Sequence, residues 1–523
     1  YESAAALRPS SNGPIPISTL CERFSLAPAS AEDAAALNDL SILGVSVDSA
    51  DTAPGELFVG LPGFTVHGAR FAAEAVASGA VAVLTDADGA QIVHQTAPGT
   101  PTLVHSDPRA VVGPLSAEVY HHPARGLVTT AVTGTNGKTT TAYFLDAILS
   151  AHVGGCMVAG TVELRVGERS VESPRTTVEA PVLQRMMALA VEDRVGAASL
   201  EASSHAIVLH RLDGLVVDVA GFTNLQRDHL DFHKTMEGYL EAKAQLFTPE
   251  HARRGVVCVD DQWGAALAAE APIEIDRVRA YPGDTPADWW VSDAAVSLTD
   301  SATTFTLHGP DGEKIEASCP LPGLVNVQNA ALALVMAIRA GVPAATAATA
   351  LAGAHNIPGR MQRISQRDGR RGLCIVDFAH TPDAMELALK AVRPITPGRL
   401  IVVFGSDGDR DQGKRPMLGE VCARLADVLV VTDENPRSED PQLIRNAILE
   451  GVRGVRPDLT DVEEITTWRG DAVRRGVELC GPDDTVIVTG KGHEPFLEMA
   501  GEFIRYNDAP VMAEAVEEKW GRA

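Results

Sequence analysis

The sequence has no long apolar run. Its longest one, residues 330–338, ends at Arg339 and is far shorter than the roughly 20 residues that cross a bilayer. We therefore expect no membrane-spanning helix. Residues 1–30 also lack a basic segment followed by an apolar core, which is the pattern of a secretory signal. We expect a cytoplasmic protein.

Paired cysteines are absent as well. The seven cysteines are scattered and contain no C-x-x-C pair. This pattern favours reduced core thiols of a cytosolic protein over disulfides or zinc ligands.

Basic residues are few for the length of the chain. The 44 Lys and Arg residues stand against 69 Asp and Glu residues, so the formal net charge is -25. Such a charge argues against a nucleic-acid-binding surface and against adhesion to an anionic membrane. We expect small-molecule partners, a monomer, and at most a local basic pocket for a phosphorylated substrate.

What the sequence does contain is typical of a large globular protein. Its 523 residues are 45% hydrophobic and 22% charged. A chain of this length is too long for one core, and the length suggests about three domains.

One stretch has a clear chemical signature. An apolar, β-branched run at residues 127–133 leads into Gly134-Thr135-Asn136-Gly137-Lys138-Thr139-Thr140, and a helical apolar pattern follows through residue 149. The two glycines let backbone N–H groups surround a polyphosphate, Lys138 can neutralise its charge, and the Thr139 hydroxyl can reach Mg²⁺. The stretch predicts an ATP site between a strand and a helix. Val132 stands where the usual G-x-x-x-x-G-K-[ST] pattern has its first glycine, so ordinary P-loop enzymes are not the nearest match.

Further along, polar residues follow short apolar runs. Glu201 and Asn224 each end one, and His229 comes shortly after. Ligands collect at the carboxyl ends of parallel strands, so these side chains are expected to face the phosphates held by Lys138. Glu201 and His229 are candidate Mg²⁺ ligands beside Thr139, although a lone histidine is more often structural.

Two further residues have unremarkable local settings. Lys243 lies in a helical pattern over residues 239–247, where composition predicts a solvated surface lysine. Asn326 lies near the start of an Ala-rich helix, where its side chain can cap the helix or meet an adenine. Capping is the default expectation.

The N-terminal region is predicted to be a small α/β domain. Strands are expected at residues 57–59, 81–85 and 102–105, with a helix at 71–78. The loops at 47–49 and 63–70 carry polar groups at strand ends. On the sequence alone, a turn is favoured over a ligand contact for these loops.

The C-terminal region repeats the strand-end pattern four times. Apolar runs at 373–376, 400–404, 428–432 and 486–489 each end in charged or Gly-rich segments, which predicts a doubly wound domain with a binding crevice. We therefore expect an α/β fold of three domains: residues 1–122, a central P-loop parallel-sheet domain at 123–355, and a Rossmann-like domain at 356–523.

Together these motifs resemble the Mur ligase family over nearly the whole chain and in the right order. The motifs are Gly134-Thr-Asn-Gly-Lys-Thr-Thr140, Glu201-Ala-Ser-Ser-His205, Asn224 with Asp228-His-Leu-Asp231, Gly323-x-x-Asn326-Val-x-Asn329, Pro358-Gly-Arg360, Asp377-Phe-Ala-His380 and Gly490-Lys-Gly-His-Glu494. The resemblance implies that the first domain binds UDP, the central domain ATP and Mg²⁺, and the last domain an amino acid.

The resemblance also implies residue roles. The catalytic residues would be Lys138, Lys243, Glu201 and His229, and the metal ligands Thr139, Glu201, His229 and Lys243 as a carbamate. ATP would contact Gly134, Thr135, Asn136, Gly137, Lys138, Thr139, Thr140, Asn326, Arg360 and Asp377. The UDP-N-acetylmuramoyl-dipeptide would contact Val47, Ser49, Phe64, Thr65, Val66, Thr176, Thr177, Ser203 and Arg211. The amino acid would contact Arg410, Glu434, Asn435, Pro436, Arg437, Gly490 and Glu494.

Within the family, the C-terminal motifs are most similar to members that add meso-diaminopimelate to UDP-N-acetylmuramoyl-L-alanyl-D-glutamate in peptidoglycan precursor synthesis. In these members ATP activates the glutamate γ-carboxylate as an acyl phosphate. A lysine-adding or folylpolyglutamate-type ligase and a regulatory ATPase without ligase activity are the alternatives. Arg437 argues against the lysine-adding ligase, and the apparent UDP-binding N-terminal region argues against the folylpolyglutamate-type ligase. Glu434 stands for a usual aspartate, Phe378 for a tyrosine, Ala50 for an arginine and Leu209 for a glutamine of some relatives.

Overall fold

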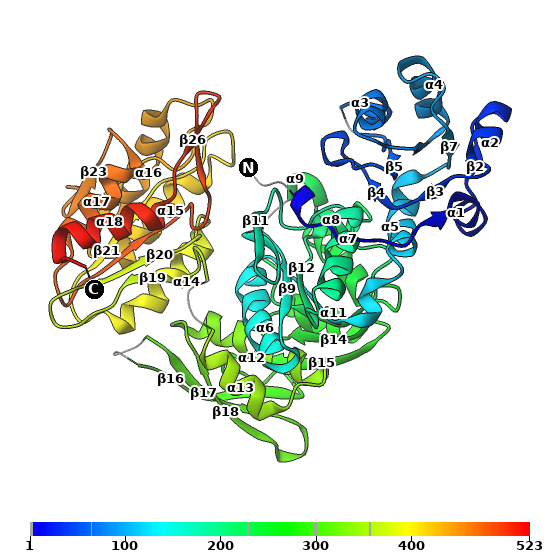
Figure 1. Ribbon diagram of the computed structural model, residues 1–523. Coiled ribbons are helices and arrows are strands. Elements are labelled where there is room, and N and C mark those ends of the chain that lie inside the picture. Colours follow the sequence, from blue (N-terminus) through cyan, green and yellow to red (C-terminus); the bar gives the residue numbers. More distant parts are fainter. Residues whose placement is uncertain (1–3, 64, 227–229, 298–300, 355–356, 523) are drawn as a thin grey trace. The chain divides into compact units, whose positions relative to one another are not determined.

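The computed structural model describes residues 4–63, 65–226, 230–297, 301–354 and 357–522 (Figure 1). The chain forms two compact parts. The first part comprises Tyr1–Arg279, Gly283–Trp289 and Leu332–Ala350, and the second Ala280–Pro282, Trp290–Ala331 and Leu351–Ala523. Each part is described separately below. The three-domain division at residues 122 and 355 stays a prediction.

The first part begins with a small sheet of strand order β2-β7-β6-β5-β4, in which β4 to β7 are parallel. The strands are β2 Ala27–Pro28, β4 Gly44–Ser46, β5 Glu56–Val59, β6 Ala82–Thr85 and β7 Thr102–Val104. Its helices are α1 Ile17–Phe24, α2 Ala31–Leu37, α3 Ala72–Ala77, α4 Ala87–Thr96 and α5 Pro108–Val119, and β1 Ile15–Pro16 pairs with β3 Ser41–Ile42. The predicted strands and helix of this region are confirmed.

A larger sheet of the first part has the order β11-β10-β9-β12-β8-β13-β14-β15. The strands are β8 Val128–Thr133, β9 Cys156–Ala159, β10 Glu163–Val166, β11 Arg169–Glu172, β12 Ala197–Glu201, β13 Val217–Phe222, β14 Ala252–Cys258 and β15 Glu274–Arg279. The helices are α6 Lys138–Val153, α7 Ala180–Glu192, α8 Ser204–Val208, α9 Leu230–His233, α10 Met236–Ala244, α11 Gln262–Glu270 and α13 Ala344–Ala352, and α12 Leu324–Arg339 runs through both parts. From β9 to β15 the strands are parallel, so their carboxyl ends share one edge.

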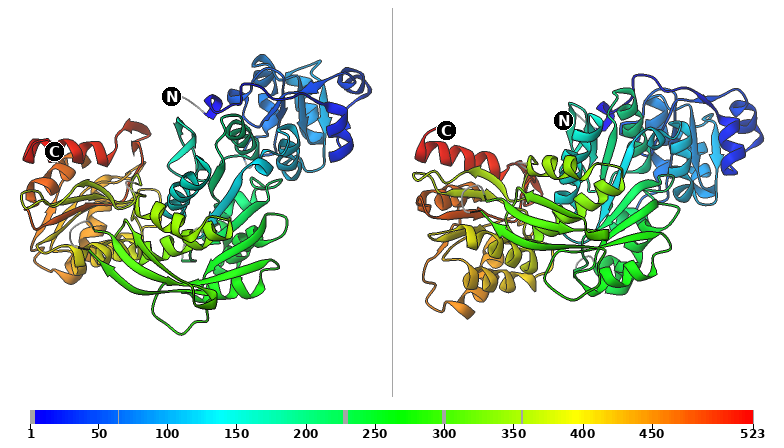
Figure 2. Two further views of the ribbon diagram at one scale, coloured as in Figure 1. Left: turned by 60° about the horizontal axis from the view of Figure 1, so that its bottom comes forward. Right: turned by 90° about the horizontal axis from the view of Figure 1, so that it is seen from below.

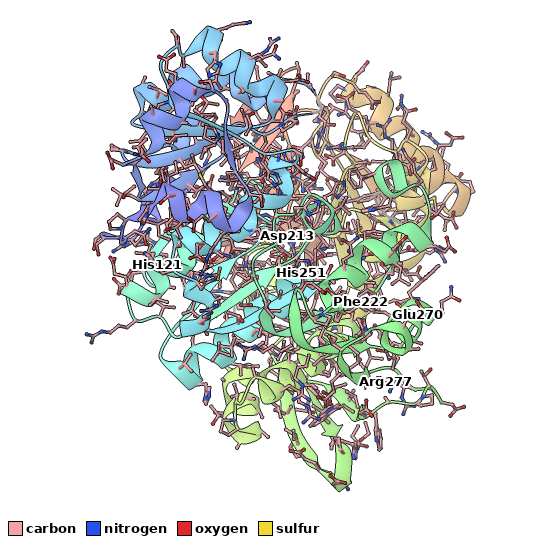
Figure 3. All side chains as sticks on the ribbon, turned by 90° about the vertical axis from the view of Figure 1, so that its right-hand side faces the viewer. His121, Asp213, Phe222, His251, Glu270 and Arg277 are labelled. Carbon is pink, nitrogen blue, oxygen red and sulfur yellow. The ribbon has the colours of Figure 1, made fainter. Side chains whose placement is uncertain are left out.

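Apolar contacts form the core of the larger sheet, and polar contacts join its surface loops. Phe222 at the end of β13 is fully buried. At the surface, Asp213 accepts a hydrogen bond from His210 Nδ1 at 2.8 Å and lies 3.7 Å from His251 Nε2 (Figure 3). The backbone of Asp213 also packs against Gly113 of α5, where a Cβ atom would come within 2.3 Å of the Asp213 carbonyl oxygen. Contact this close requires a residue without a side chain.

A buried arginine joins the N-terminal segment, the small sheet and α7 within the first part. Arg185 of α7 is 1% exposed. It donates hydrogen bonds to the carbonyl oxygens of Ala4 (2.7 Å) and Leu7 (3.2 Å) and to the carboxylate of Asp51 (2.9 Å). Arg8 also binds Asp51. Because a buried guanidinium needs several acceptors, this arrangement fixes the turn that follows β4 relative to α7.

We expect Arg185→Met to lower the free energy of unfolding of the first part by about 3 kcal/mol. Removing one partner of a buried ion pair leaves the charge of the other partner, Asp51, in a poorly solvating environment. Arg8 still partly compensates Asp51. Calorimetry should show the first unfolding transition lowered by roughly 6–12 °C. Arg125→Met, at an exposed position, is the control, and an equal shift in both variants would contradict the prediction.

The second part contains an antiparallel group and a separate sheet. Strands β16 Trp289–Val296, β17 Thr303–His308 and β18 Lys314–Cys319 pair antiparallel. The C-terminal sheet has the order β19-β20-β24-β21-β22-β23, parallel except for β19. Its strands are β19 Gln362–Ser365, β20 Leu373–Val376, β21 Leu400–Phe404, β22 Val428–Val431, β23 Val462–Glu464 and β24 Thr485–Val488, followed by the hairpin β25 Phe496–Met499 and β26 Glu502–Arg505.

Helices cover both faces of the C-terminal sheet (Figure 2). They are α14 Pro382–Val392, α15 Lys414–Leu425, α16 Pro441–Val455, α17 Arg469–Leu479 and α18 Asp508–Trp520. Strands β20, β21, β22 and β24 are buried at every position, as expected of parallel strands covered on both faces. The predicted α/β fold with parallel-sheet cores is confirmed.

Two regions contain elements that were not predicted. The Ala-rich stretch at 341–353 contains helix α13, because alanine has the highest helix propensity. The antiparallel strands β16 to β18 were not predicted.

The cysteines and the helices can be set beside the expectations drawn from composition. All seven cysteines are free thiols, and six of them are buried. Within the described residues, none of the helices has the length and apolar character needed to span a bilayer.

Candidate active site

The phosphate loop connects β8 to α6 as predicted. Gly134 and Gly137 have φ angles of 144° and 90°, a region that favours glycine. At Gly134 a Cβ atom would lie 1.8 Å from the Thr223 hydroxyl oxygen, so a larger residue cannot fit. The loop therefore follows from its glycines, and α6 begins at Lys138 with its first N–H groups directed toward the loop.

The end of β13 holds the loop in place. Asn136 N donates to the Asn224 side chain at 3.0 Å, and Thr135 N donates to the Asn224 carbonyl oxygen at 2.9 Å. The Thr223 hydroxyl donates to the Asn136 carbonyl oxygen at 2.6 Å. These contacts place Asn224 against the loop, and its predicted role toward ATP stays a prediction. The same contacts also pre-organise the loop, which reduces the entropy cost of binding a phosphate chain.

Two lysines share one carbonyl oxygen of the loop. Lys138 Nζ and Lys243 Nζ each donate to Gly134 O at 2.9 Å. Lys243 is 1% exposed and lies 4.4 Å from the centre of the Tyr239 ring. The composition-based interpretation of Lys243 as a solvated surface residue is therefore wrong, because α10 packs against the loop instead of facing water.

A carboxylate lies beside the first turn of α6. Glu201, at the end of β12, accepts from the Thr139 hydroxyl at 3.0 Å and from the Thr161 backbone N–H and hydroxyl at 2.9 Å each. Glu201 and Thr139 are both buried. Hard oxygen donors of this kind suit Mg²⁺, so the pair fits the predicted metal site.

The rest of the predicted metal site is only partly visible. Across the part of the chain that the structure describes, no three His, Cys, Asp or Glu side chains gather as a ready metal site. His229 and Phe64 lie outside the described residues, so their predicted roles stay predictions.

Four residues predicted to hold the muramoyl-dipeptide lie near Glu201. The Thr177 hydroxyl donates to Glu201 O at 2.7 Å and accepts from Ser203 N at 3.0 Å, and Thr176 accepts from the Thr161 hydroxyl at 3.2 Å. Arg211 donates to Thr177 O at 3.2 Å. The structure thus brings these predicted residues together at the carboxyl end of β12.

Arg211 is held by an acid that the sequence did not point to. Its Nε lies 2.9 Å from Glu179, which also pairs with Arg175 (3.2 Å) and Arg109 (3.9 Å). Burial lowers the pKa of Arg211, while Glu179 opposes that shift. Three guanidinium groups around one carboxylate leave a net positive charge, which suits an anionic substrate.

The predicted uridine contacts are more dispersed. Ser49 begins the short turn Ser49–Asp51, two residues after Val47, and its hydroxyl donates to Glu74 of α3 at 2.8 Å. Thr65 and Val66 are exposed. Asp51 ends the turn that begins at Ser49, so the salt bridge between Asp51 and Arg185 also holds this turn in place.

The predicted nucleotide residues of the second part lie in buried or half-buried settings. Asn326 lies in the first turn of α12, and its Nδ2 donates to Pro322 O at 2.9 Å, so its amide contacts the segment before the helix. The Arg360 guanidinium lies 4.4 Å from the centre of the Phe378 ring. Asp377 accepts from the backbone N–H groups of Met361 (2.8 Å) and Ala379 (2.9 Å), while burial raises its pKa.

The carboxyl ends of β22 and β24 meet at a buried lysine. Lys491 is fully buried and donates to the Asn435 side chain at 2.9 Å, to Glu494 at 3.0 Å and to Phe496 O at 2.6 Å. Asn435 in turn donates to Glu494 at 3.1 Å. Two predicted amino-acid contacts, Asn435 and Glu494, are therefore positioned by Lys491, which lies inside a motif quoted for the resemblance but was assigned no role.

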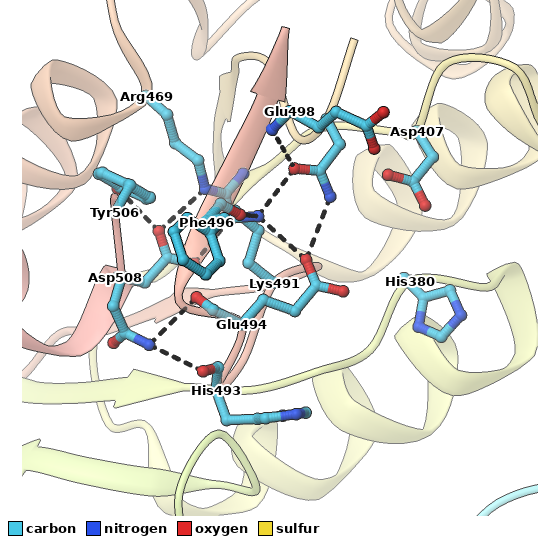
Figure 4. Close-up of polar contacts among 12 residues, drawn as sticks. His380, Asp407, Arg469, Lys491, His493, Glu494, Phe496, Glu498, Tyr506 and Asp508 are labelled. Carbon is cyan, nitrogen blue, oxygen red and sulfur yellow. Dashed lines mark hydrogen bonds and ion pairs between the residues drawn. The ribbon is translucent and has the colours of Figure 1, made fainter. Parts of the chain in front are cut away.

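A second buried cation ties the same strand ends to α18. Arg469 donates to both oxygens of Asp508 and to the carbonyl oxygens of Asp433 and Thr489, at 2.7–2.9 Å (Figure 4). The Tyr506 hydroxyl donates to Asp508 at 2.8 Å. Sequence patterns did not point to Arg469, because its partners are 20 to 39 residues away.

The other predicted amino-acid residues surround this centre. Glu434 and Pro436 are buried beside Asn435 in the segment after β22, and a Cβ atom on Gly490 would come within 2.6 Å of Glu434 Oε2. Arg437 follows, with a φ angle of 55°, and its backbone bonds to the β25–β26 hairpin at Glu498 and Ala500. Arg410 is exposed in the segment after β21.

Comparison with known proteins places this architecture in a family. Residues 41–118 match the model of the Mur ligase family catalytic domain, residues 132–337 the Mur ligase middle domain, and residues 359–492 the Mur ligase glutamate ligase domain. A protein from Streptomyces coelicolor, named UDP-N-acetylmuramoyl-L-alanyl-D-glutamate--2,6-diaminopimelate ligase, is 43% identical over 480 residues, or 92% of this chain and 93% of its own. The chain belongs to the Mur ligase family.

A second relative and a solved structure also support the assignment to the Mur ligase family. A UDP-N-acetylmuramyl-tripeptide synthetase from Leifsonia xyli subsp. xyli is 42% identical over 508 residues, which cover 96% of each chain. A solved structure of a UDP-N-acetylmuramoyl-L-alanyl-D-glutamate--2,6-diaminopimelate ligase superposes with a TM-score of 0.64 at 31% identity, covering 92% of this chain and 95% of that one. The resemblance drawn from the motifs is therefore confirmed.

Proposed function

We propose that this Mur ligase family member is an ATP-dependent amide ligase that adds meso-diaminopimelate to UDP-N-acetylmuramoyl-L-alanyl-D-glutamate during peptidoglycan precursor synthesis. The observation that carries the proposal is the 43% identity, over nine-tenths of both chains, with a protein of that name. The phosphate loop, Arg437 and Glu494 supply the chemistry that the activity needs. We also propose that the protein acts in the cytoplasm and as a monomer.

Amide formation from a carboxylate requires activation. The γ-carboxylate of the D-glutamate residue attacks the γ-phosphorus of ATP, an acyl phosphate forms and ADP leaves. The N–H groups of the loop from Gly134 to Thr140 hold the phosphates, and Lys138 turns from its backbone acceptors to the γ-phosphoryl group, where negative charge develops. The incoming amine then attacks the acyl carbon, phosphate leaves, and the amine loses its proton.

Thr139, Glu201 and His229 would hold Mg²⁺, and the first two supply the hard oxygen atoms that this ion prefers. When bound, Mg²⁺ neutralises charge on the phosphate oxygens. Thr176, Thr177, Ser203 and Arg211 would orient the dipeptide so that its γ-carboxylate reaches the nucleotide.

Lys243 would act as a carbamate. The neutral amine adds CO₂ and loses a proton, which places a carboxylate beside the loop. The two lysine amines lie 2.9 Å from the same carbonyl oxygen, and two ammonium groups so close repel each other. A carbamate on Lys243 replaces that repulsion with attraction to Lys138 and offers a further oxygen to the metal site.

The test is a turnover assay with the purified chain. ADP release should require both UDP-N-acetylmuramoyl-L-alanyl-D-glutamate and meso-diaminopimelate, and mass spectrometry should detect the UDP-linked tripeptide. A parallel screen with lysine and with folate plus glutamate covers the other ligase activities of this fold. ATP hydrolysis that is indifferent to both substrates would contradict the proposal and indicate an ATPase without ligase activity.

A further inference from the structure

The acid Glu179 stands at the start of α7 but does not cap that helix. It is the N-cap residue, and within the described chain its side chain makes no capping hydrogen bond. An N-cap position favours Ser, Thr, Asp or Asn, whose short side chains can bond the first free N–H groups of a helix. Helix capping therefore does not account for a glutamate at this position.

The side chain of Glu179 instead contacts arginines from three separate segments. Glu179 Oε1 lies 2.9 Å from Arg211 Nε and 3.2 Å from Arg175 Nη1, and Oε2 lies 3.9 Å from Arg109 Nη1. Arg109 lies in the first turn of α5, which packs against α7 (Figure 1). The helix dipole opposes a cation in a first turn, so the stability of α5 does not explain Arg109 either.

Of the three arginines, Arg211 is the one on which Glu179 acts most strongly. Its side chain is 14% exposed, against 26% for Arg109 and 48% for Arg175, and solvent screens exposed ion pairs. Burial lowers the pKa of Arg211, Glu179 opposes that shift, and Arg175 and Arg109 add to it. Without Glu179, the poorly solvated guanidinium of Arg211 would face two like charges and no acid.

The contact with Glu179 holds Arg211 without using up its donors. Arg211 Nη1 donates to Thr177 O at 3.2 Å. Arg211 Nε lies close to Glu179 but makes no aligned hydrogen bond with any described residue, so the two side chains form an ion pair and Nε–H stays available. Because one acid among three guanidinium groups leaves a surplus of positive charge, Glu179 can order Arg211 without cancelling its attraction for an anion.

We propose that Glu179 is a positioning residue for the UDP-linked substrate and that it acts through Arg211. Glu179 fixes the guanidinium beside Thr177 before the substrate arrives, so binding does not have to order that side chain. The part of the substrate that depends on Glu179 is the anionic D-glutamate residue, not the UDP or the sugar. This inference rests on the proposed function, because it concerns the substrate assigned there.

The test compares two ligands by calorimetry on the full chain. UDP-N-acetylmuramoyl-L-alanyl-D-glutamate is the dipeptide ligand, and UDP-N-acetylmuramoyl-L-alanine, which lacks the D-glutamate residue, is the alanine ligand. Glu179→Gln removes the charge and keeps the size, so it should raise the Kd of the dipeptide ligand about tenfold, as expected for a lost charge-assisted contact. The Kd of the alanine ligand should change less than about twofold. Glu514→Gln, in an exposed ion pair with Arg474, is the matched control and should change neither.

A second background shows whether Glu179 acts through Arg211. Arg211→Met removes the guanidinium, and in this background Glu179→Gln should not weaken binding of the dipeptide ligand any further, because residues that act through one contact are not additive. A purely structural role would give the same loss with and without Arg211. In turnover assays, Glu179→Gln should raise KM for the dipeptide ligand and leave KM for ATP unchanged.

The possible outcomes separate the two proposals. Equal losses for both ligands or additive losses in the double variant would overturn the role of Glu179, and tighter binding by Glu179→Gln would show that the acid competes with the substrate. Retained binding of the alanine ligand shows that the variant is folded. Calorimetry needs no turnover, so a wild-type chain that binds with this dependence on Glu179 but forms no tripeptide would contradict the proposed function alone.

Discussion

Lys243→Ala is expected to lower kcat at least about a thousandfold, because it removes a charged group from the water-poor site where phosphoryl transfer occurs. Lys243 is buried and donates to Gly134 O, the same atom that Lys138 contacts. As a carbamate it would supply a negative group at the loop. Alanine supplies none, and Lys138 and the metal site would lose their organising partner.

Chemical rescue distinguishes the carbamate from a plain lysine. Formate or acetate at high concentration should restore part of the activity of Lys243→Ala, because the cavity left by the side chain admits a short carboxylate. An added alkylamine should not. Lys314→Ala, at an exposed position at the start of β18, is the control and should retain full activity.

Two observations would contradict this prediction. Wild-type turnover in Lys243→Ala would show that the side chain is dispensable. Rescue by amines and not by carboxylates would show that an ammonium group, and not a carbamate, acts there. ATP binding by the variant should be measured in parallel, so that a lost nucleotide site is not mistaken for lost chemistry.

Arg437→Ala is expected to remove the preference for meso-diaminopimelate over lysine. The two amino acids differ by one carboxylate, which the guanidinium of Arg437 would pair with two parallel hydrogen bonds. With lysine, the half-buried guanidinium would be left without that partner. We expect kcat/KM for meso-diaminopimelate to fall about a hundredfold, whereas that for lysine changes little.

The neighbouring acids limit how large this effect can be. Arg437 lies 3.8 Å from Asp407 and 3.6 Å from Glu498, so part of its charge is already balanced without substrate. The ratio of the two kcat/KM values is the measurement, and Arg453→Ala, at an exposed position of α16, is the control. An unchanged ratio would remove Arg437 from the specificity argument.

The elements that the sequence predicted well depend on local interactions. The loop from Gly134 to Thr140 needs positive φ angles at two glycines, and the adjoining strand and helix are determined by apolar patterns of their own. Likewise, the buried strands of the C-terminal sheet were predicted as uniformly apolar runs. Such features can be predicted without knowing which residues they meet in space.

The errors and omissions share a different cause. Lys243 was interpreted from composition as a surface residue because its own helix has no strong apolar face, and only the packing of α10 against the loop buries it. Arg185, Arg469 and Lys491 were assigned no role because each has partners in other elements, up to 181 residues away for Arg185. Their positions follow from the pairing of charges that folding removes from water.

The amino-acid sequence by itself therefore determined the α/β class, the phosphate loop and the polar ends of the strands, since these depend on backbone conformation and on short-range apolar periodicity. Tertiary structure alone decided which of those polar ends meet. It placed Lys243 beside Lys138 and Glu201 beside Thr139. The reason is that a parallel sheet aligns the carboxyl ends of strands that are distant in sequence, and only this alignment brings their charges close enough to interact.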